Sequence, residues 1–372
     1  MAREPITQEL EAAPEADRLG AFPHPRMTKH LFGHDAIVQM LAEAGRGGRM
    51  HHGWLLSGPE GVGKATLAYH LARFLLAPEA DRDASLGPLG VRPTSTAQRQ
   101  VAALSHPGLL LLRRPWDSKT KRHAAGIPID EVRRLRMFLG HAAEADAWRV
   151  VLVDTADDLA AAAANAILKS LEEPPPRTVF ILISSEPGRL LPTIRSRCRR
   201  LDLEGLNDED LKRAAQQAIG NAEDAKVPEP SDWAQLLYLA QGRARRALAV
   251  SSSGGLTLYT QMRGVVELLP KLDWAAVHKL SDELAGTAAE QKFEAFYEFL
   301  LDLLAQLIRT RATGIGPDIA LAKRLIPDGQ LPRAAEAWSE IVAAKAQAMA
   351  LNLDRKALIM ATVEKMAVVA RG

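Results

Sequence analysis

The sequence predicts an α/β domain with a parallel sheet, then a small helical unit, and finally an all-α domain. A glycine-rich loop stands between an apolar strand and an apolar helix at residues 54–76. Strand and helix patterns alternate with it up to about residue 205, which is typical of a parallel sheet. Beyond that point the strand patterns fade and apolar residues follow helical spacing. A chain of 372 residues is long enough for two or three such domains.

The first predicted strand is WLLSG, residues 54–58, and the helix after the loop is TLAYHLARFLL, residues 66–76. Further strands are expected at 108–114, 148–159 and 177–185. The run at 148–159 is continuously apolar and rich in β-branched residues, as in a strand buried on both faces. An alanine-rich helix precedes the last of these strands and should end before Pro174, because a proline disfavours helical geometry in the residue before it.

The predicted domains follow from these patterns. Residues 1–22 are acidic and rich in proline and alanine, and we expect a flexible tail there. Residues 23–205 form the α/β domain, 206–252 a small helical lid, and 258–372 a helical domain, with SSSGGLT (251–257) as a hinge. In the last domain the helical spacing i, i+3, i+4, i+7 is followed by Phe293, Phe296, Tyr297, Leu300, Leu304 and Leu307.

Composition excludes several classes of protein. With 47 basic and 45 acidic residues the net charge is +2, so no global charge favours nucleic acid. The single cysteine, Cys198, excludes an internal disulfide framework and a cysteine-rich zinc site. The N-terminus lacks the pattern of a signal peptide, and no apolar run approaches the roughly 18–20 residues that cross a bilayer. We therefore expect a cytoplasmic protein that does not bind a membrane.

The loop GPEGVGKA departs at one position from the pattern G-x-x-x-x-G-K-[ST]. That pattern uses glycines for its turns, Lys64 for the terminal phosphates and the next hydroxyl for magnesium. Here the next residue is Ala65. Thr66 follows, but one helical step rotates a side chain by about 100°, so its hydroxyl should point away from the metal. Backbone N–H groups of the loop can still hold phosphates, so weak binding of ATP or ADP stays open. The predicted loop residues of a degenerate nucleotide site are Gly58, Gly61, Gly63, Lys64 and Thr66.

A second element of a nucleotide site follows at the end of the strand VVLVDTADD. Asp154 is the residue type that holds magnesium at this place in phosphate-loop proteins. The presence of Lys64 upstream favours this role over a merely structural capping role. We therefore add Asp154 to the degenerate site.

Four segments together resemble the AAA+ clamp-loader family of bacterial DNA polymerase III. LLPTIRSRCRR (190–200) is similar to the family's SRC motif, and ANAILKSLEEPP (164–175) to the helix after the magnesium aspartate. HLFGHDAIVQML (30–41) resembles the opening box beside the adenine site, and GRAR (242–245) fits a sensor-2 pattern. The resemblance covers residues 23–250 closely and the helical remainder only in type.

The resemblance implies an AAA+ module, a lid and a helical collar. The collar would dock beside motor and delta-type subunits in a ring that loads a sliding clamp onto primed DNA. AAA+ ATPases carry a glutamate directly after the magnesium aspartate, whereas this chain has Thr155. The resemblance therefore implies a non-hydrolysing subunit, a stator, that needs no cofactor of its own. Arg197 of the SRC motif would act in trans as an arginine finger on a neighbour's ATP, and Arg245 would be the sensor-2 residue. Residues 77–100 lack the four cysteines of the family's zinc module, so no zinc is expected.

Two other interpretations stay open from the sequence. The chain could be an active AAA+ ATPase, such as a motor subunit of the same machine, although Ala65 and Thr155 argue against it. It could also be an unrelated phosphate-loop regulator or kinase, which would have a small-molecule partner and would need no collar.

Overall fold

The computed structural model describes residues 14–20, 22–120, 122–140, 147–222, 227–252, 254–286, 289–316, 318–351 and 353–372. The chain divides into two compact units. The first comprises Met1–Val227 and Ala240–Leu248, and the second Pro228–Leu239 and Ala249–Gly372. The predicted lid, 206–252, is thus shared between them, since α7 (Asp208–Gly220) lies in the first unit and most of α8 (Trp233–Ala240) in the second. Helix α9 (Ala244–Ser252) begins in the first unit and ends in the second.

The first unit is built on a parallel sheet, as predicted. The strand order is β2-β5-β6-β1-β7, and every neighbouring pair is parallel. The strands are β1 (Gly53–Ser57), β2 (Leu109–Leu112), β5 (Arg149–Val153), β6 (Thr178–Ser184) and β7 (Arg199–Asp202). In the register, Gly53 lies beside Phe180 and Ser57 beside Ser184. The carboxyl ends of β1, β5 and β6 therefore meet at one edge, where a nucleotide site is expected.

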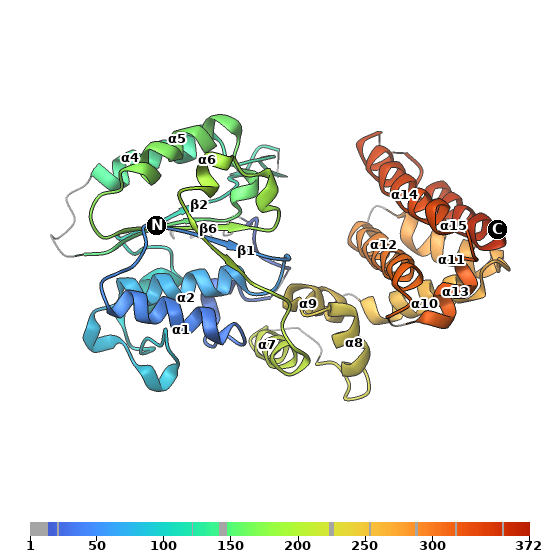
Figure 1. Ribbon diagram of the computed structural model, residues 1–372, viewed down its shortest axis with the longest axis horizontal. Helices are drawn as coiled ribbons and strands as arrows, with labels where there is room; N and C mark the ends of the chain where they lie inside the picture. The colour runs from blue at the N-terminus through green and yellow to red at the C-terminus, as the bar shows by residue number, and fades with distance from the viewer. Residues whose placement is uncertain are drawn as a thin grey trace, which may run out of the picture. The chain divides into compact units, whose positions relative to one another are not determined.

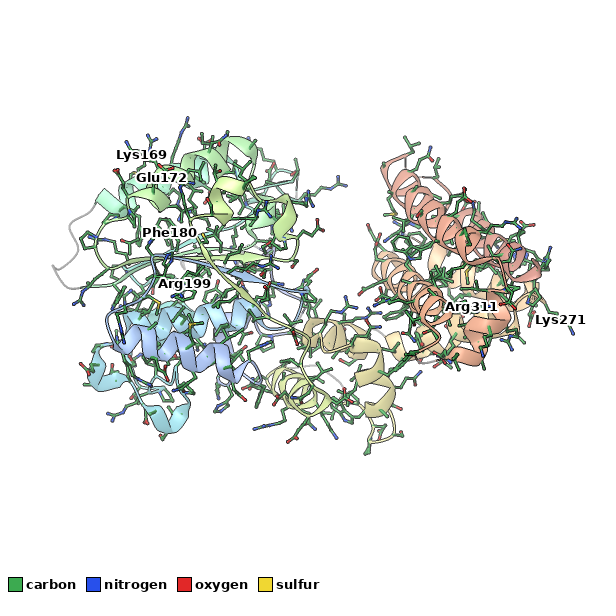
Figure 2. All side chains as sticks on the ribbon, viewed as in Figure 1. Lys169, Glu172, Phe180, Arg199, Lys271 and Arg311 are labelled. Carbon is green, nitrogen blue, oxygen red and sulfur yellow. The ribbon has the colours of Figure 1, made fainter. Side chains whose placement is uncertain are left out.

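Helices cover both faces of the sheet (Figure 1). Helices α1 (Asp35–Arg46) and α2 (Lys64–Leu76) lie on one face, and α4 (Ile129–Gly140), α5 (Ala161–Glu172) and α6 (Pro192–Arg195) on the other. Successive residues of β1 serve opposite faces, because Leu56 belongs to the apolar cluster under α2 and Leu55 to the cluster under α5. Phe180 on β6 is fully buried within the second of these clusters (Figure 2). Helix α5 ends two residues before Pro174, as predicted.

Shorter elements connect these layers. They are η1 (Pro25–Met27), η2 (Glu79–Asp81), η3 (Ala84–Leu86), α3 (Thr96–Ala102), β3 (Trp116–Asp117), β4 (Arg122–His123), η4 (Ala156–Asp158) and η5 (Pro187–Arg189). Strands β3 and β4 pair antiparallel in a sheet of their own.

The second unit is helical, in agreement with the all-α prediction. Its further helices are α10 (Gly255–Leu268), α11 (Trp274–Ala285), α12 (Glu290–Thr313), α13 (Ile319–Leu325), α14 (Leu331–Leu351) and α15 (Arg355–Arg371). The predicted apolar stripe lies on α12 and faces the core, with all of its residues buried except the half-buried Leu304. Across the described part of the chain, no helix has the length and apolar character needed to cross a membrane.

Gly58, in the first turn of the phosphate loop, leaves no room for a larger side chain. A Cβ atom at Gly58 would lie 2.0 Å from the carbonyl oxygen of Leu203, and Gly58 has a φ of 137°. We predict that Gly58→Ala lowers the free energy of unfolding of the first unit by about 3 kcal/mol, because overpacking and positive φ each cost about 1 kcal/mol or more. Chemical denaturation measures this. Gly48→Ala is the control, since Gly48 has a φ of 65° but no atom within 4 Å of the added Cβ; an equal loss in both variants would contradict the steric account.

Candidate functional site

The glycine loop keeps a wound conformation between β1 and α2. The φ angles of Gly58, Gly61 and Gly63 are 137°, 84° and 104°, values that favour glycine. His34, from the segment before α1, supports the loop through a hydrogen bond of 2.9 Å between its Nε2 and the Val62 carbonyl oxygen. The shape of a phosphate loop is therefore present.

The ammonium group of Lys64 is already saturated by the protein. Its Nζ donates to the carbonyl oxygens of Gly58 and Pro59 at 2.6 and 2.7 Å, and to Ser185 Oγ at 3.0 Å. A lysine has three N–H donors, so none is left for a phosphate unless one of these bonds breaks. Burial lowers the pKa of Lys64 to about 8, against the opposing charges of nearby carboxylates.

The two residues after Lys64 do not supply a metal ligand. Ala65 is half-buried and packs against the apolar cluster on the α2 side of the sheet. Thr66 is also half-buried, and among the described residues its hydroxyl makes no hydrogen bond to Lys64 or Asp154.

Asp154 lies directly after β5 and is only 7% exposed. Burial, together with the negative charge of Asp17 and a hydrogen bond to Asp17, raises its pKa to about 7, although the charges of Arg113 and Lys64 oppose this shift. Within the described part of the chain, its Oδ2 has no hydrogen-bond partner. At neutral pH this carboxyl group is therefore partly protonated, which weakens it as a magnesium ligand. Thr155 follows as the N-cap residue of η4 and offers no carboxylate.

Two residues near the loop, Asp157 and Ser185, were not predicted from the sequence. Asp157 accepts hydrogen bonds from Ser184 Oγ at 2.5 Å and from the backbone N–H of Ser185 at 2.6 Å. Ser185 in turn receives the bond from Lys64. Only their positions could have indicated them, because DTADD follows β5 and Ser185 follows β6, and these two strands are neighbours in the sheet.

Arg245, the predicted sensor-2 residue, lies beside the loop, and its guanidinium group is used within the chain. Its backbone N–H donates to the Gly61 carbonyl oxygen at 3.3 Å. Its Nε lies 3.1 Å from a carboxylate oxygen of Glu60, and its Nη1 donates to the carbonyl oxygen of Asp17 at 2.9 Å.

Residues 15–17, predicted as part of a flexible tail, are bound to the first unit. Arg113, just after β2, contacts Glu15 and Asp17, each at 3.0 Å. Glu15 also pairs with Arg26 at 2.6 Å, and Asp17 with His24 at 2.6 Å. Burial raises the pKa of Asp17, but the hydrogen bond from His24 and the charge of Arg113 more than offset this and lower the pKa to about 2. Residues 1–13 and 21 of the predicted tail lie outside the described residues.

A magnesium nucleotide does not fit the residues as they stand. The lysine donors are satisfied, the hydroxyl at position 65 is missing, and the Asp154 carboxyl is partly neutral. Over the described residues, no three His, Cys, Asp or Glu side chains are grouped to hold a metal ion. The expectation of no zinc stays a prediction.

Arg197 lies away from this loop, at the opposite end of β1. A Cβ atom on Gly53, the first residue of β1, would lie 3.0 Å from the Arg197 carbonyl oxygen. The loop begins after Ser57, so the length of the strand, about 13 Å, separates the two places. Arg197 Nη2 pairs with Glu172 at 2.6 Å, and Nη1 donates to the Thr193 carbonyl oxygen at 2.8 Å.

The surroundings of Arg197 are partly open to solvent. Its side chain is 33% exposed, and its partner Glu172 stands at the last turn of α5 (Figure 2). The adjacent Cys198 is half-buried against the apolar cluster under α5, and burial raises the pKa of its thiol to about 11. Cys198 thus anchors the segment in the core while Arg197 stays at the surface.

Comparison with known proteins shows which proteins this chain is similar to. Residues 33–207 match the family described as "DNA polymerase III, delta subunit". DNA polymerase III subunit delta' of Pseudomonas aeruginosa is 42% identical over 154 residues, which are 41% of this chain and 43% of that protein. The corresponding subunit of Escherichia coli is 35% identical over 161 residues, 43% of this chain and 45% of that protein.

Other relatives extend further along the chain. DNA polymerase III subunit tau of Salmonella typhimurium is 26% identical over 333 residues, 82% of this chain and 49% of that protein. The chain thus spans about half the length of the curated relatives it matches. A solved DNA polymerase III gamma-subunit-related protein of Thermotoga maritima aligns with 89% of this chain and 99% of its own, at 18% identity and a TM-score of 0.43. Over residues 33–207 the chain is therefore similar to the delta-prime subunits of DNA polymerase III.

Proposed function

We propose that this chain is a non-hydrolysing stator subunit of the DNA polymerase III clamp loader, which supports ATP-driven loading of the sliding clamp onto primed DNA. The observation that carries the proposal is the saturation of Lys64 by the loop's own carbonyl oxygens and Ser185. A subunit with this site needs no cofactor of its own, and any binding of ATP or ADP is weak.

Two further chemical groups that ATP hydrolysis uses are missing near the loop. Ala65 cannot ligate magnesium, and Thr155 cannot polarise an attacking water as a carboxylate would. These losses are independent of the Lys64 contacts, and they point the same way. They also disfavour the alternative of an active motor subunit.

The second part of the proposal assigns Arg197 to catalysis in trans. The backbone of Arg197 lies at the end of β1 away from the chain's own loop, and this supports a role of the guanidinium group on another subunit's phosphates. A half-buried arginine held by one carboxylate and one carbonyl oxygen can exchange these two partners for phosphate oxygens, which can bind a guanidinium group in a bidentate way.

The partners in this proposal are motor and delta-type subunits, which would dock on the helices of residues 258–372. This unit exposes large apolar side chains on several helices, as an interface requires. They include Trp274, Val342, Leu351 and Val368. The sliding clamp and primed DNA would be partners of the assembled complex.

Turnover by the purified chain tests the stator assignment. With magnesium, ATP and primed DNA we expect no phosphate release above background, and no change with Lys64→Ala. A robust rate that Lys64→Ala abolishes would refute the proposal. The double variant Ala65→Thr and Thr155→Glu gives a second test. The ATP turnover of a motor subunit should hardly depend on these substitutions, because a motor subunit needs no such repair.

A further inference from the structure

We propose that residues 15–17 form an acidic plug, an intramolecular ligand of the degenerate nucleotide site that keeps nucleotide phosphates out of it. The plug is defined by Glu15 and Asp17 and by the backbone between them. It goes beyond the stator function, because it concerns what occupies the site rather than what the chain does for its neighbours.

The plug spans the site from the loop to the strand ends. On the loop side, the Asp17 carbonyl oxygen receives a hydrogen bond from Arg245, which itself is bound to Gly61 and Glu60. On the strand side, the Asp17 carboxylate contacts Arg113 and lies against Asp154. Magnesium would require the space beside Asp154, so a bound nucleotide and the plug compete for one place.

The plug also neutralises the cations that would attract phosphates. Arg113 follows β2 at the same edge of the sheet, and both of its terminal nitrogens are held by Glu15 and Asp17. Arg26 is paired with Glu15. These side chains are between 12% and 23% exposed, so solvent screens the ion pairs only in part. Two carboxylates thus take the role that phosphate oxygens have in a loaded site.

A buried histidine fixes the orientation of Asp17. The backbone N–H of Arg26 donates to His24 Nδ1, so that nitrogen carries no proton and Nε2 is the donor to Asp17. The ring is 3% exposed and packs edge-on against Tyr69 of α2, with centroids 5.5 Å apart. The carboxylate is therefore placed by the core of the module and not by chance contact of a loose tail.

Neutralising the plug should uncover the site. If only a small fraction of molecules has the site free, the apparent affinity is reduced by that fraction. We expect the full-length double variant Glu15→Gln and Asp17→Asn to bind a fluorescent ATP analogue with magnesium at least about ten-fold more tightly than the unmodified chain. Adding Lys64→Ala to the double variant should remove the gain. The matched control is Glu79→Gln with Glu229→Gln, two exposed acids, and it should leave binding unchanged.

Trypsin provides a second readout within the plug itself, since cleavage after Arg18 requires residues 15–20 to leave the module. Cleavage at this site should be faster in the double variant than in the control, while the remaining sites are cut at equal rates. If the double variant is destabilised as a whole, Glu15→Gln alone, which keeps the pair of Asp17 and His24, should give a smaller gain in both readouts.

Several results would refute the proposal of an acidic plug. These are equal binding by the unmodified chain and a folded double variant, a gain that survives Lys64→Ala, or a gain shared by the control. Because the readout is binding and not turnover, failure of the plug leaves the stator proposal standing. Conversely, a plug confirmed by binding would stand even if Arg197 had no role in trans.

Discussion

Replacement of Arg197 by alanine is expected to lower the ATP turnover of the reconstituted clamp loader by about 10³-fold, the lower end of the effect of an arginine finger. The expected loss is large because the guanidinium group stabilises charge that develops only in the transition state. The measurement is steady-state phosphate release with clamp and primed DNA. Size-exclusion chromatography must show equal assembly of both complexes.

Arg195→Ala is the matched control for this variant. Arg195 is an exposed arginine at the end of α6, two residues away, so its removal changes the local charge by the same amount. We expect the control to keep turnover within about two-fold, since surface charges away from a site have small effects. Unchanged turnover in Arg197→Ala would make the pair with Glu172 merely structural and would refute the assignment in trans.

Asp154→Asn is expected to stabilise the first unit at pH 8 by on the order of a few kcal/mol, because a raised pKa of a buried carboxyl group costs about 1.4 kcal/mol per pKa unit once the group must ionise. The pKa of Asp154 in the folded chain is about 7, above the usual value of 3.8. A raised pKa contributes stability that is complete below pH 3.8 and is lost as the pH rises through 7. The unmodified unit should therefore weaken between pH 5 and 8, whereas the variant, which cannot ionise, should not.

Chemical denaturation at pH 5 and pH 8 measures this difference. Asp81→Asn, a change in another aspartate of the same unit, should retain the pH dependence of the unmodified chain. Parallel pH profiles for Asp154→Asn and the unmodified chain would contradict the protonated state of this buried carboxyl. The asparagine is close in shape to aspartic acid, so a change in packing does not explain a difference confined to high pH.

The core of the module was predictable because its signals are local. The strand β1, the loop and α2 follow one another within 24 residues, and each has its own pattern of apolar spacing. The end of α5 was set by Pro174. Strand β7 was missed, since it is an edge strand in which Arg199, Arg200 and Asp202 are exposed and only Leu201 is half-buried. Such strands lack the apolar alternation on which prediction depends.

The acidic plug could not be predicted because its partners are far away in the sequence. Asp17 and Arg113 are 96 residues apart, and Glu15 and Arg113 are 98. Two acids in a segment rich in proline and alanine look the same whether they are solvated or bound. For the candidate site, the loop pattern gave Lys64, the end of a predicted strand gave Asp154, and the family resemblance gave Arg245. The bonds from Lys64 and Arg245 to neighbouring carbonyl oxygens and side chains emerged only from the tertiary structure.

The saturated Lys64 has a consequence for the chain in a cell whose energy supply changes. A protein that binds a nucleotide gains stability with the logarithm of the nucleotide concentration, so its folded population follows the level of ATP. Here Lys64 donates its hydrogen bonds to oxygen atoms of Gly58, Pro59 and Ser185, in the place of nucleotide phosphates. Under the proposed stator function, the folded population of this chain would therefore not follow the level of ATP.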